Sequence, residues 1–317
     1  MKVVFMGTPD FAAEILKALR QCPVELQAIF TQPDRPVGRR QVMTPPAVKV
    51  LAEEYGLPVY QPERIKRVRW VEELRSLAPD LIVVAAYGQI LSREILDIPP
   101  LGCINIHGSL LPRYRGAAPI QWCIANGEEK TGVTAMQMNE GMDTGDMLLK
   151  REVPIAADET AESLFRKLAD EGALLIQEVV ERLLAGETLP RERQDEAQAT
   201  YAPILKKEDG LIDWSRPAKD ISCRIRGFYP WPGSYTYWQG QKLLIEEACP
   251  LEEEGEGGPG AVQPSSSGGK QARLLVQTGK GLLQIKRLQP QGKKSMEAEA
   301  FLRGHSLQGA VLGSPRE

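Results

Sequence analysis

The sequence predicts an α/β fold in which an open, mainly parallel sheet is followed by a smaller β-barrel. Three observations support this prediction. The chain begins with an apolar strand, a turn at Gly7 and a helical pattern over Phe11–Leu19, as open α/β sheets do. The run Leu81–Ala86 is apolar throughout, which is typical of a central parallel strand covered on both faces. From Gly210 onward, short strands alternate with glycine turns, which favours a small barrel.

Length, charge and cysteine content restrict the class of protein. With 317 residues, the chain is too long for one small core, so we expect two domains. A formal net charge of -3 argues against a protein that binds nucleic acid over most of its surface, but it allows local basic patches. The five cysteines form no CxxC pair, which indicates reduced thiols in a cytoplasmic protein. No signal peptide and no run of membrane-spanning length is visible, so we expect no membrane partner.

The elements of the first domain follow from hydrophobic periodicity and from turn residues. Strands are expected at Lys2–Met6, Leu26–Phe30, Pro58–Tyr60, Leu81–Ala86, Cys103–His107, Gly132–Met138 and Met147–Pro154. Helices are expected at Phe11–Leu19, Pro45–Ala52, Trp70–Leu77, Ile120–Ala125 and Thr160–Leu184, the last capped by Asp158 or Thr160 and closed by Ala185-Gly186. A dinucleotide fold would carry GxGxxG after the first strand, where only Gly7 is present, so we expect no nucleotide cofactor.

The segment Thr31–Arg40 is rich in proline and glycine and contains three arginines, Arg35, Arg39 and Arg40. We expect proline and glycine to keep it out of regular structure, and guanidinium groups suit contacts with phosphates. A solvated surface loop is the simpler interpretation of such a charge run. The length of the loop favours a functional one, because long structureless loops in compact domains are often functional.

The stretch Cys103–Pro112 is the strongest candidate for a reaction centre. If Ile104 and Ile106 point into a core, the alternation of a strand places Asn105 and His107 together on its other face. Gly108 then breaks the strand. In an open parallel sheet, ligands bind outside the carboxyl ends of the strands, where both Tyr87-Gly88 and His107-Gly108 fall. The alternative is a strand end that carries two satisfied polar residues.

The loop Glu140–Asp146 places two glycines around Asp143 and Asp146. An Asp-Thr-Gly motif occurs in aspartic proteases, but such a site needs two equivalent carboxylates, which the sequence does not provide. Aspartate and glycine also dominate ordinary turns for backbone reasons. We therefore interpret Asp146 as an ordinary turn residue.

The second half of the chain differs in charge and composition. From Tyr201 onward there are 16 Lys and Arg residues against 13 Asp and Glu residues, six of the acids lying between Glu246 and Glu256. Strands are expected near Ser234–Trp238, Lys242–Ala248, Arg273–Val276 and Gly281–Leu288, with a mobile loop over Glu252–Gly269. Eight basic residues could line a phosphate-binding face, although solvated side chains are an equally simple interpretation. They are Lys206, Lys207, Arg224, Arg226, Lys286, Arg287, Lys293 and Lys294.

The run Asn105–Gly116, together with Gly141–Gly145, resembles the folate-dependent formyltransferases. The likeness extends over nearly the whole chain, through Val4–Ala12, Gln32–Arg39, Ala85–Gly88 and Tyr229–Gly233. The Asp34–Arg40 loop and the added barrel point to the branch of this family that acts on initiator methionyl-tRNA. The loop reads Gly-Arg-Arg-Gln-Val where the family often has more lysine.

The segment Gln194–Ala202 is polar and irregular, which suits an interdomain linker. Together with the resemblance, this predicts a Rossmann-like sheet domain over residues 1–189, a linker over 190–207 and an OB-like β-barrel that binds tRNA over 208–317. The resemblance implies catalysis by Asn105, His107 and Asp143. An amide can donate to the oxyanion of a tetrahedral intermediate, and an imidazole beside a carboxylate can relay a proton. The implied formyl donor is 10-formyltetrahydrofolate. Its implied contacts are Ser109, Leu110, Leu111 and Pro112, with apolar walls at Tyr87 and Ile90.

The implied tRNA contacts are Arg35, Arg39, Arg40, Lys206 and Lys207, and we expect a monomer without a metal ion. The implied reaction formylates the methionine α-amine of initiator tRNA. One alternative is formyl transfer to a small amine such as a ribonucleotide or an amino sugar, which the second domain disfavours. Another is a non-catalytic RNA-binding protein, which the intact Asn105, His107 and Asp143 disfavour.

Overall fold

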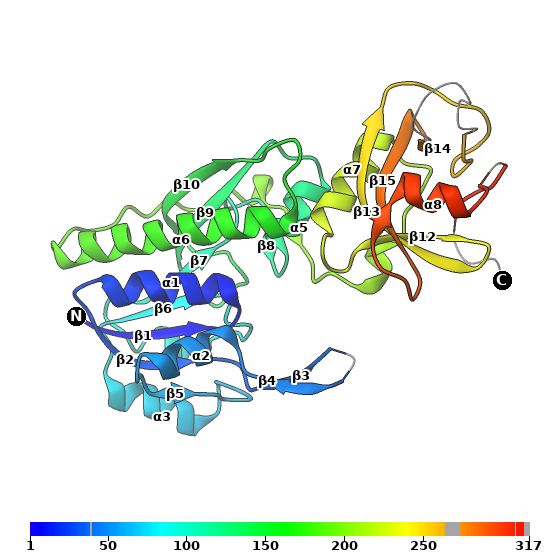
Figure 1. Cartoon of the computed structure of the whole chain (residues 1–317). Coiled ribbons are helices and arrows are strands. Elements are labelled where there is room, and N and C mark those ends of the chain that lie inside the picture. The colour runs from blue at the N-terminus through cyan, green and yellow to red at the C-terminus, as the bar shows by residue number, and fades with distance from the viewer. Residues whose placement is uncertain (39, 264–272, 308, 314–317) are drawn as a thin grey trace. The chain divides into compact units, whose positions relative to one another are not determined.

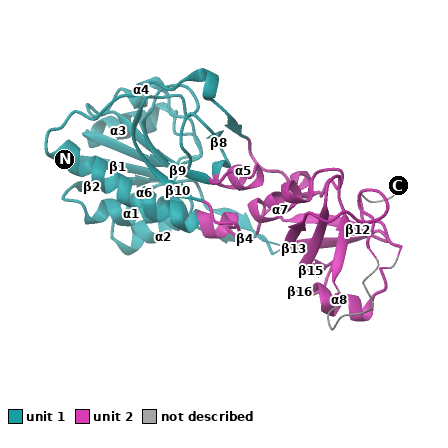
Figure 2. Ribbon diagram, turned by 90° about the horizontal axis from the view of Figure 1, so that it is seen from above, with its two compact units in different colours: residues 1–119, 130–154, 165–202 teal, residues 120–129, 155–164, 203–317 magenta. Residues whose placement is uncertain are grey.

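The computed structural model describes residues 1–38, 40–263, 273–307 and 309–313. The chain divides into two compact units (Figures 1 and 2). Unit 1 comprises residues 1–119, 130–154 and 165–202, and unit 2 comprises residues 120–129, 155–164 and 203–317. None of the helices in the described ranges combines the length and apolar character that crossing a bilayer requires.

Unit 1 is built on a seven-stranded sheet of order β10-β9-β7-β6-β1-β2-β5. Five strands run parallel, namely β1 (Lys2–Gly7), β2 (Glu25–Phe30), β5 (Val59–Tyr60), β6 (Leu81–Ala85) and β7 (Cys103–His107). The edge strands β9 (Lys130–Gln137) and β10 (Met147–Pro154) pair antiparallel. The prediction of a mainly parallel open sheet is therefore confirmed.

Helices connect the parallel strands of this sheet (Figure 1). They are α1 (Asp10–Gln21), α2 (Ala47–Glu54), α3 (Val68–Leu77) and α4 (Arg93–Leu96), while α5 (Pro119–Ala125) precedes β9 and α6 (Ala161–Leu184) follows β10. Thr160 caps α6, because its hydroxyl oxygen accepts from the Ser163 N–H at 3.2 Å. Gly186 ends this helix with a φ of 74°.

Both faces of β7 are covered, which explains why polar residues on it are buried. On one side, the backbone of Gly172 in α6 approaches Ile106 and Ile15, and a Cβ at this glycine would lie 3.3 Å from the Ile106 side chain. On the other side, Cys103 packs into a cluster with residues of β1, β6 and α3. Because side chains alternate along a strand, Asn105 and His107 share the face of Cys103. The predicted grouping of these two residues is confirmed.

The arginine-rich segment differs from its prediction. It forms a two-stranded hairpin of β3 (Arg35–Val37) and β4 (Val42–Thr44), although we expected no regular structure. Every residue of both strands is exposed, and Pro36 is tolerated because such a strand lies at an edge. At the base, Lys49 and Gln61 hold the Asp34 carboxylate with bonds of 2.9 Å and 2.7 Å. These donors keep the pKa of Asp34 below its ordinary value.

Residues 194–202 are more ordered than we expected. They contain a 3-10 turn (Glu196–Gln198) and the short strand β11 (Tyr201–Ala202), which pairs in parallel with β8 (Arg115–Gly116). Gln194 is only 5% exposed. Gln194 and Ala202 are buried, whereas Asp195, Glu196 and Gln198 are exposed, as the polar composition of the segment indicated.

Unit 2 contains a five-stranded antiparallel sheet of β12 (Ser234–Trp238), β13 (Gln241–Leu251), β15 (Leu282–Pro290), β14 (Leu274–Gln277) and β16 (Met296–Glu297). Isolated bridges join β14 to Val262, Ala261 to Val311, and Gly313 to β12. These bridges close the strands into a ring, so the predicted barrel is confirmed. The 3-10 helix η2 (Lys207–Gly210) and the helices α7 (Ala218–Gly227) and α8 (Ala298–Gly304) complete the unit.

The barrel core comes from alternate residues of the strands and from α7 and α8. Among its most buried members are Ile225, Ile245, Val276, Leu283 and Phe301. Part of the predicted loop Glu252–Gly269 lies outside the described residues; its portion up to Gly260 is free of helix and strand.

Candidate active site

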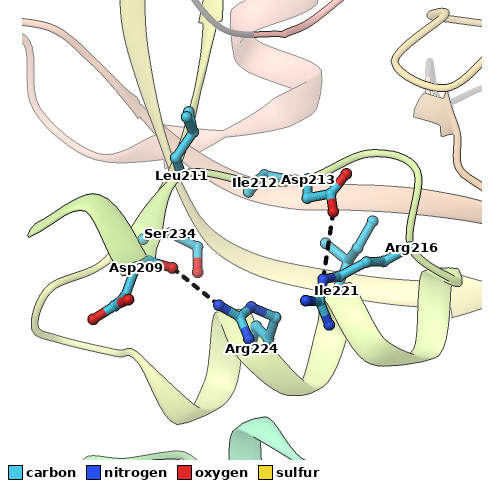
Figure 3. Close-up of a pocket in the computed structure, with 9 residues that line it drawn as sticks. Asp209, Leu211, Ile212, Asp213, Arg216, Ile221, Arg224 and Ser234 are labelled. Atoms are coloured by element: carbon cyan, nitrogen blue, oxygen red, sulfur yellow. Dashed lines mark hydrogen bonds and ion pairs between the residues drawn. The ribbon is translucent and has the colours of Figure 1, made fainter. Parts of the chain in front are cut away.

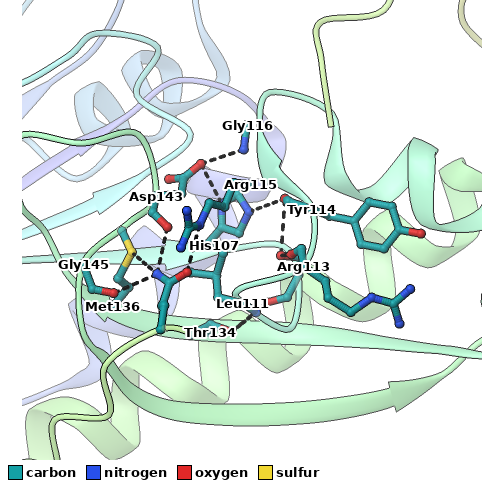
Figure 4. Close-up of polar contacts among 12 residues, drawn as sticks. His107, Leu111, Arg113, Tyr114, Arg115, Gly116, Thr134, Met136, Asp143 and Gly145 are labelled. Atoms are coloured by element: carbon teal, nitrogen blue, oxygen red, sulfur yellow. Dashed lines mark hydrogen bonds and ion pairs between the residues drawn. The ribbon is translucent and has the colours of Figure 1, made fainter. Parts of the chain in front are cut away.

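His107 stands at the carboxyl end of β7, opposite Thr134 of β9, and is 7% exposed. Its Nε2 lies 2.9 Å from the main-chain carbonyl oxygen of Tyr114 (Figure 4). Because a carbonyl oxygen only accepts, Nε2 must carry the proton of this hydrogen bond. In the neutral ring, Nδ1 is then left with its lone pair. The Tyr114 carbonyl therefore fixes which nitrogen of His107 is available as a base.

Asp143 faces that available nitrogen. Its Oδ2 lies 3.7 Å from Nδ1 of His107 and accepts a 2.8 Å hydrogen bond from the Gly116 N–H (Figure 4). A separation of 3.7 Å is too long for a direct hydrogen bond but short enough for strong electrostatic interaction in a site where Asp143 is 16% exposed. A small group lying off the line between the two atoms can contact both at about 2.8 Å.

Asn105 lies two residues before His107 on the same face of β7, opposite Met136. Its side chain is 8% exposed, and within the described ranges its amide makes no hydrogen bond to protein. An amide without a protein partner is available to donate to a ligand. The structure therefore brings the three predicted catalytic residues together. His107 and Asp143 are 3.7 Å apart, and Asn105 lies beside His107 on the same face of β7.

The predicted folate-binding segment is a rigid turn. The Thr134 hydroxyl donates to the Ser109 carbonyl at 2.7 Å and accepts from the Leu111 N–H at 3.2 Å (Figure 4). The Ser109 side chain is fully buried and donates to the Arg113 carbonyl at 2.6 Å. Because the 0% exposure of Ser109 includes its main chain, this residue offers no surface to a ligand in this structure.

The remaining apolar positions of the predicted folate site differ in exposure. Tyr87 is 2% exposed and lies in the core beside β6, where burial raises the pKa of its hydroxyl. Ile90 is 72% exposed, while Leu110 and Pro112 are partly exposed. Only the last three offer side-chain surface to a ligand in this structure.

The predicted tRNA contacts lie on exposed surface. Arg35 begins β3, Arg40 lies in the hairpin turn, and Lys206 and Lys207 lie at η2. None of these four side chains forms an ion pair with another described residue. Arg39 lies outside the described residues. Cations without an ion-pair partner are available for phosphates, although Arg35 also donates to the Gln32 amide oxygen at 3.2 Å.

Several other basic residues of unit 2 are already engaged. Arg226 donates to the Glu159 carbonyl at 2.7 Å, and Arg224 donates to the Asp209 carbonyl at 3.3 Å while it packs over the rings of Trp122 and Phe228. Lys286 and Arg287 pair with Glu247 and Glu297. The predicted basic face is therefore smaller than its composition suggested.

A small hollow lies in unit 2 beside α7 (Figure 3). Its charged lining residues pair with one another, Arg224 with the Asp209 carbonyl and Arg216 with Asp213 at 3.6 Å. Of its lining residues, only Arg224 belonged to the predicted basic face. Among the described residues, no cluster of three or more His, Cys, Asp or Glu side chains could hold a metal ion.

Sequence reasoning missed four residues that hold this site together. Tyr114 acts through its carbonyl, which every residue possesses, so no sequence signal could reveal it. Thr134, Gln194 and Arg115 act through side chains. Arg115 lies in the run Asn105–Gly116 that carries the family resemblance, but no feature of the sequence indicated a role for it. Arg115 is 0% exposed and binds both Gln194 and Glu196 (Figure 4 shows the arginine).

Two family models match the chain. The model described as formyl transferase matches residues 1–180, and the model described as formyl transferase, C-terminal domain, matches residues 204–306. These two matches together cover most of both units.

Close relatives carry one name. A methionyl-tRNA formyltransferase of Citrifermentans bemidjiense is 50% identical over 314 residues, which cover 99% of this chain and 96% of the relative. A methionyl-tRNA formyltransferase of Desulfotalea psychrophila is 51% identical over 307 residues, covering 97% and 94%.

Among solved structures, an N-formyltransferase from Helicobacter canadensis in complex with folinic acid and dTDP-3-aminofucose has the same fold. It matches with a TM-score of 0.67 at 18% identity and covers 90% of this chain and 98% of its own.

Proposed function

This chain belongs to the formyl transferase family, and from that membership we propose that it formylates the α-amino group of methionine on initiator methionyl-tRNA. The product is N-formylmethionyl-tRNA, which is used to initiate translation. The observation that carries this proposal is the sequence identity to methionyl-tRNA formyltransferases. It is 50% and 51% in two relatives, and the matches extend through both units.

The formyl donor is a folate, and we take it to be 10-formyltetrahydrofolate. The H. canadensis enzyme binds folinic acid, a related formyl folate. The turn Ser109–Pro112 fits such a ligand, because Thr134 holds it rigid and the exposed Ile90 offers apolar surface for a flat ring. When bound there, the folate supplies the formyl group, and the protein supplies position and charge.

The chemistry requires no nucleophilic side chain, because the substrate amine attacks the formyl carbon itself. Attack creates a tetrahedral intermediate with a negative oxygen and a positive nitrogen. The free amide of Asn105 donates to the oxygen. The amine proton passes to Nδ1 of His107, the nitrogen left free by the Tyr114 carbonyl. His107 then gives this proton to N10 of the folate as the bond between N10 and the formyl carbon breaks and tetrahydrofolate leaves.

Asp143 stabilises this proton transfer. The imidazolium that forms on His107 lies 3.7 Å from the Asp143 carboxylate, which favours the charged ring. The attacking amine or a water molecule fits between the two groups and contacts both. Asp143 therefore acts on the proton rather than on the tautomer, which the Tyr114 carbonyl sets.

The tRNA is held by exposed cations. We propose contacts by Arg35, Arg39 and Arg40 near the hairpin and by Lys206 and Lys207 at η2. The domains are proposed as residues 1–189 for catalysis, 190–207 for the connection and 208–317 for tRNA binding. We propose a monomer that works in the cytoplasm.

One experiment separates this function from the alternatives. With 10-formyltetrahydrofolate as donor, the chain is offered initiator methionyl-tRNA, elongator methionyl-tRNA, a ribonucleotide amine and an amino sugar. We expect formylation of the initiator tRNA at least about 10²-fold faster than of any other acceptor. Preference for a small amine would identify the small-molecule enzyme. Binding of tRNA with no transfer to any acceptor would identify a non-catalytic RNA-binding protein.

A further inference from the structure

We propose that Gln194, clamped by Arg115, is a positioning residue that holds the Asp143 loop in its working conformation. The inference rests on the proposed function and extends its machinery to residues far along the chain from the strand that carries His107. It concerns the side-chain amide of Gln194 and the two main-chain carbonyls that this amide binds.

The amide of Gln194 spans the Asp143 loop. Its Nε2 donates two hydrogen bonds, to the carbonyl oxygens of Asp143 and Gly145, both at 2.8 Å. The Gln194 side chain is 5% exposed, so water does not compete for these bonds. Asp143 has a φ of 53°, a left-handed backbone conformation that residues with a Cβ rarely adopt without support from their surroundings. The two bonds supply that support on either side of Thr144.

Arg115 fixes the direction of the amide. Its Nε donates to Oε1 of Gln194 at 2.9 Å. Because a guanidinium has only donors, the oxygen of the amide must face Arg115 and the NH2 group must face the two carbonyls. A flipped amide would place donor against donor and acceptor against acceptor. The orientation of Gln194 is therefore chemically unique.

Arg115 is itself held firmly. It is fully buried, and its two terminal nitrogens donate to both oxygens of Glu196 at 2.9 Å and 2.8 Å. This pairing raises the pKa of Arg115, so the guanidinium stays charged. Its main-chain N–H also donates to the Thr200 carbonyl at 2.8 Å. The arginine is thus a fixed point from which Gln194 reaches the loop.

The residues on either side of Arg115 hold the catalytic groups directly. The carbonyl of Tyr114 accepts from His107, and the N–H of Gly116 donates to the Asp143 carboxylate. The run Tyr114–Gly116 therefore positions His107 through one main-chain group and Asp143 through another, while the Arg115 side chain acts on Asp143 through Gln194 (Figure 4). A shift of the clamp changes the separation of 3.7 Å between His107 and Asp143.

The test uses three variants of the full chain. Gln194→Glu keeps the size and the contact with Arg115 but presents an oxygen to the two carbonyls. Gln194→Met keeps the length without donors or charge. Gln198→Glu makes the same chemical change as the first variant at an exposed position four residues away and serves as the matched control.

Steady-state kinetics with initiator methionyl-tRNA and 10-formyltetrahydrofolate give the first result. We expect Gln194→Glu and Gln194→Met to lower kcat by about 10²-fold, as a displacement near 1 Å does, with KM for tRNA changed by less than about threefold. Gln198→Glu should match the unmodified chain. Equal losses in all three variants, or a change confined to KM, would overturn the inference.

A double-mutant cycle with Asp143→Ala separates positioning from a general loss of structure. If Gln194 acts through Asp143, then Gln194→Met should lower kcat by less than about threefold in the Asp143→Ala background. A further loss of about 10²-fold in that background would overturn the inference. Thermal unfolding of each variant accompanies the cycle, and a Gln194→Met chain that folds as stably as the unmodified one but keeps full kcat also overturns it.

The proposed function can fail separately. If the unmodified chain transfers no formyl group to methionyl-tRNA, the proposed function is wrong. If it does and the cycle is additive, only the positioning role of Gln194 is wrong.

Discussion

The surroundings of the proposed catalytic residues and the arginine hairpin are built in opposite ways. Around His107 and Asp143, buried groups are joined by directed hydrogen bonds, and the Tyr114 carbonyl decides which nitrogen is free. In the β3–β4 hairpin all strand residues are exposed, the two strands hold each other by backbone pairing, and Asp34 anchors the base through Lys49 and Gln61. The hydrogen bonds around His107 and Asp143 fix the positions of individual atoms. The exposed hairpin instead presents positive charge to solvent. We therefore expect a single substitution in the proposed active site to lower kcat strongly. Each substitution of an exposed cation should weaken tRNA binding only slightly.

The largest expected effect comes from His107→Ala. This change removes the proton acceptor, and we expect kcat for formyl transfer to fall by about 10³-fold or more. Because His107 is 7% exposed and presents little surface, affinity for initiator tRNA in a filter-binding assay should change by less than about threefold. A His107→Ala variant that binds tRNA poorly yet retains formyl transfer would show that His107 serves binding and not catalysis.

Thr134→Val is expected to have the next largest effect. The change keeps the shape of the side chain but leaves the Ser109 carbonyl and the Leu111 N–H without their partner. We expect the free energy of unfolding to fall by about 1–3 kcal/mol. The KM for the folate should rise several-fold because the turn Ser109–Pro112 loosens, while the KM for tRNA stays the same. Denaturant unfolding and steady-state kinetics measure the two effects, and an unchanged folate KM would show that this turn does not bind the donor.

Arg35→Ala and the pair Lys206→Ala, Lys207→Ala test the charged surface. We expect Kd for tRNA to rise several-fold for each, with kcat unchanged, because these side chains form no ion pair in the described part of the chain. The slope of log Kd against log salt should decrease by about one for each cation that no longer meets a phosphate. Lys17→Ala, which removes an exposed cation paired with Glu14 on α1, is the control. A salt slope equal to that of the control would exclude these residues as phosphate ligands.

Glu196→Gln should have the smallest effect, and the effect depends on pH. Hydrogen bonds from Arg115 lower the pKa of Glu196 in the folded protein. The unfolded chain therefore takes up a proton more readily, so the pair stabilises the fold above the ordinary carboxyl pKa, and this contribution disappears as pH falls through the lowered value. We expect Glu196→Gln to reduce Tm by a few degrees at neutral pH and to have less effect in acid. A decrease of Tm that is equal at all pH values would argue against the ion pair.

Much of the fold could be predicted because it depends on hydrophobic periodicity. The apolar run in β6 and the alternation in β7 placed Asn105 and His107 correctly, and glycine turns revealed the barrel. The β3–β4 hairpin could not be foreseen, because its strands bury nothing and are held only by pairing between their backbones. Most polar residues of 194–202 face water, as their composition indicated, but that composition could not show that Gln194 among them makes buried hydrogen bonds.

The residues proposed to react could be predicted from the sequence, but the groups that hold them in position could not. Asn105 and His107 follow from one strand, whereas Asp143 was linked to them through family resemblance. Their support comes from a carbonyl at Tyr114 and an amide at Gln194, which only the folded chain brings within reach. Main-chain partners leave no trace in a sequence, because they do not depend on residue type.

A single-turnover experiment tests the central claim most directly. The chain is mixed with 10-formyltetrahydrofolate labelled in the formyl group, and initiator methionyl-tRNA is then added and the reaction quenched at short intervals. Direct attack by the amine predicts that label never attaches to the protein and passes to methionine with release of one tetrahydrofolate per formyl group. Label bound covalently to the protein before tRNA is added, or methionyl-tRNA left unmodified, would contradict the account.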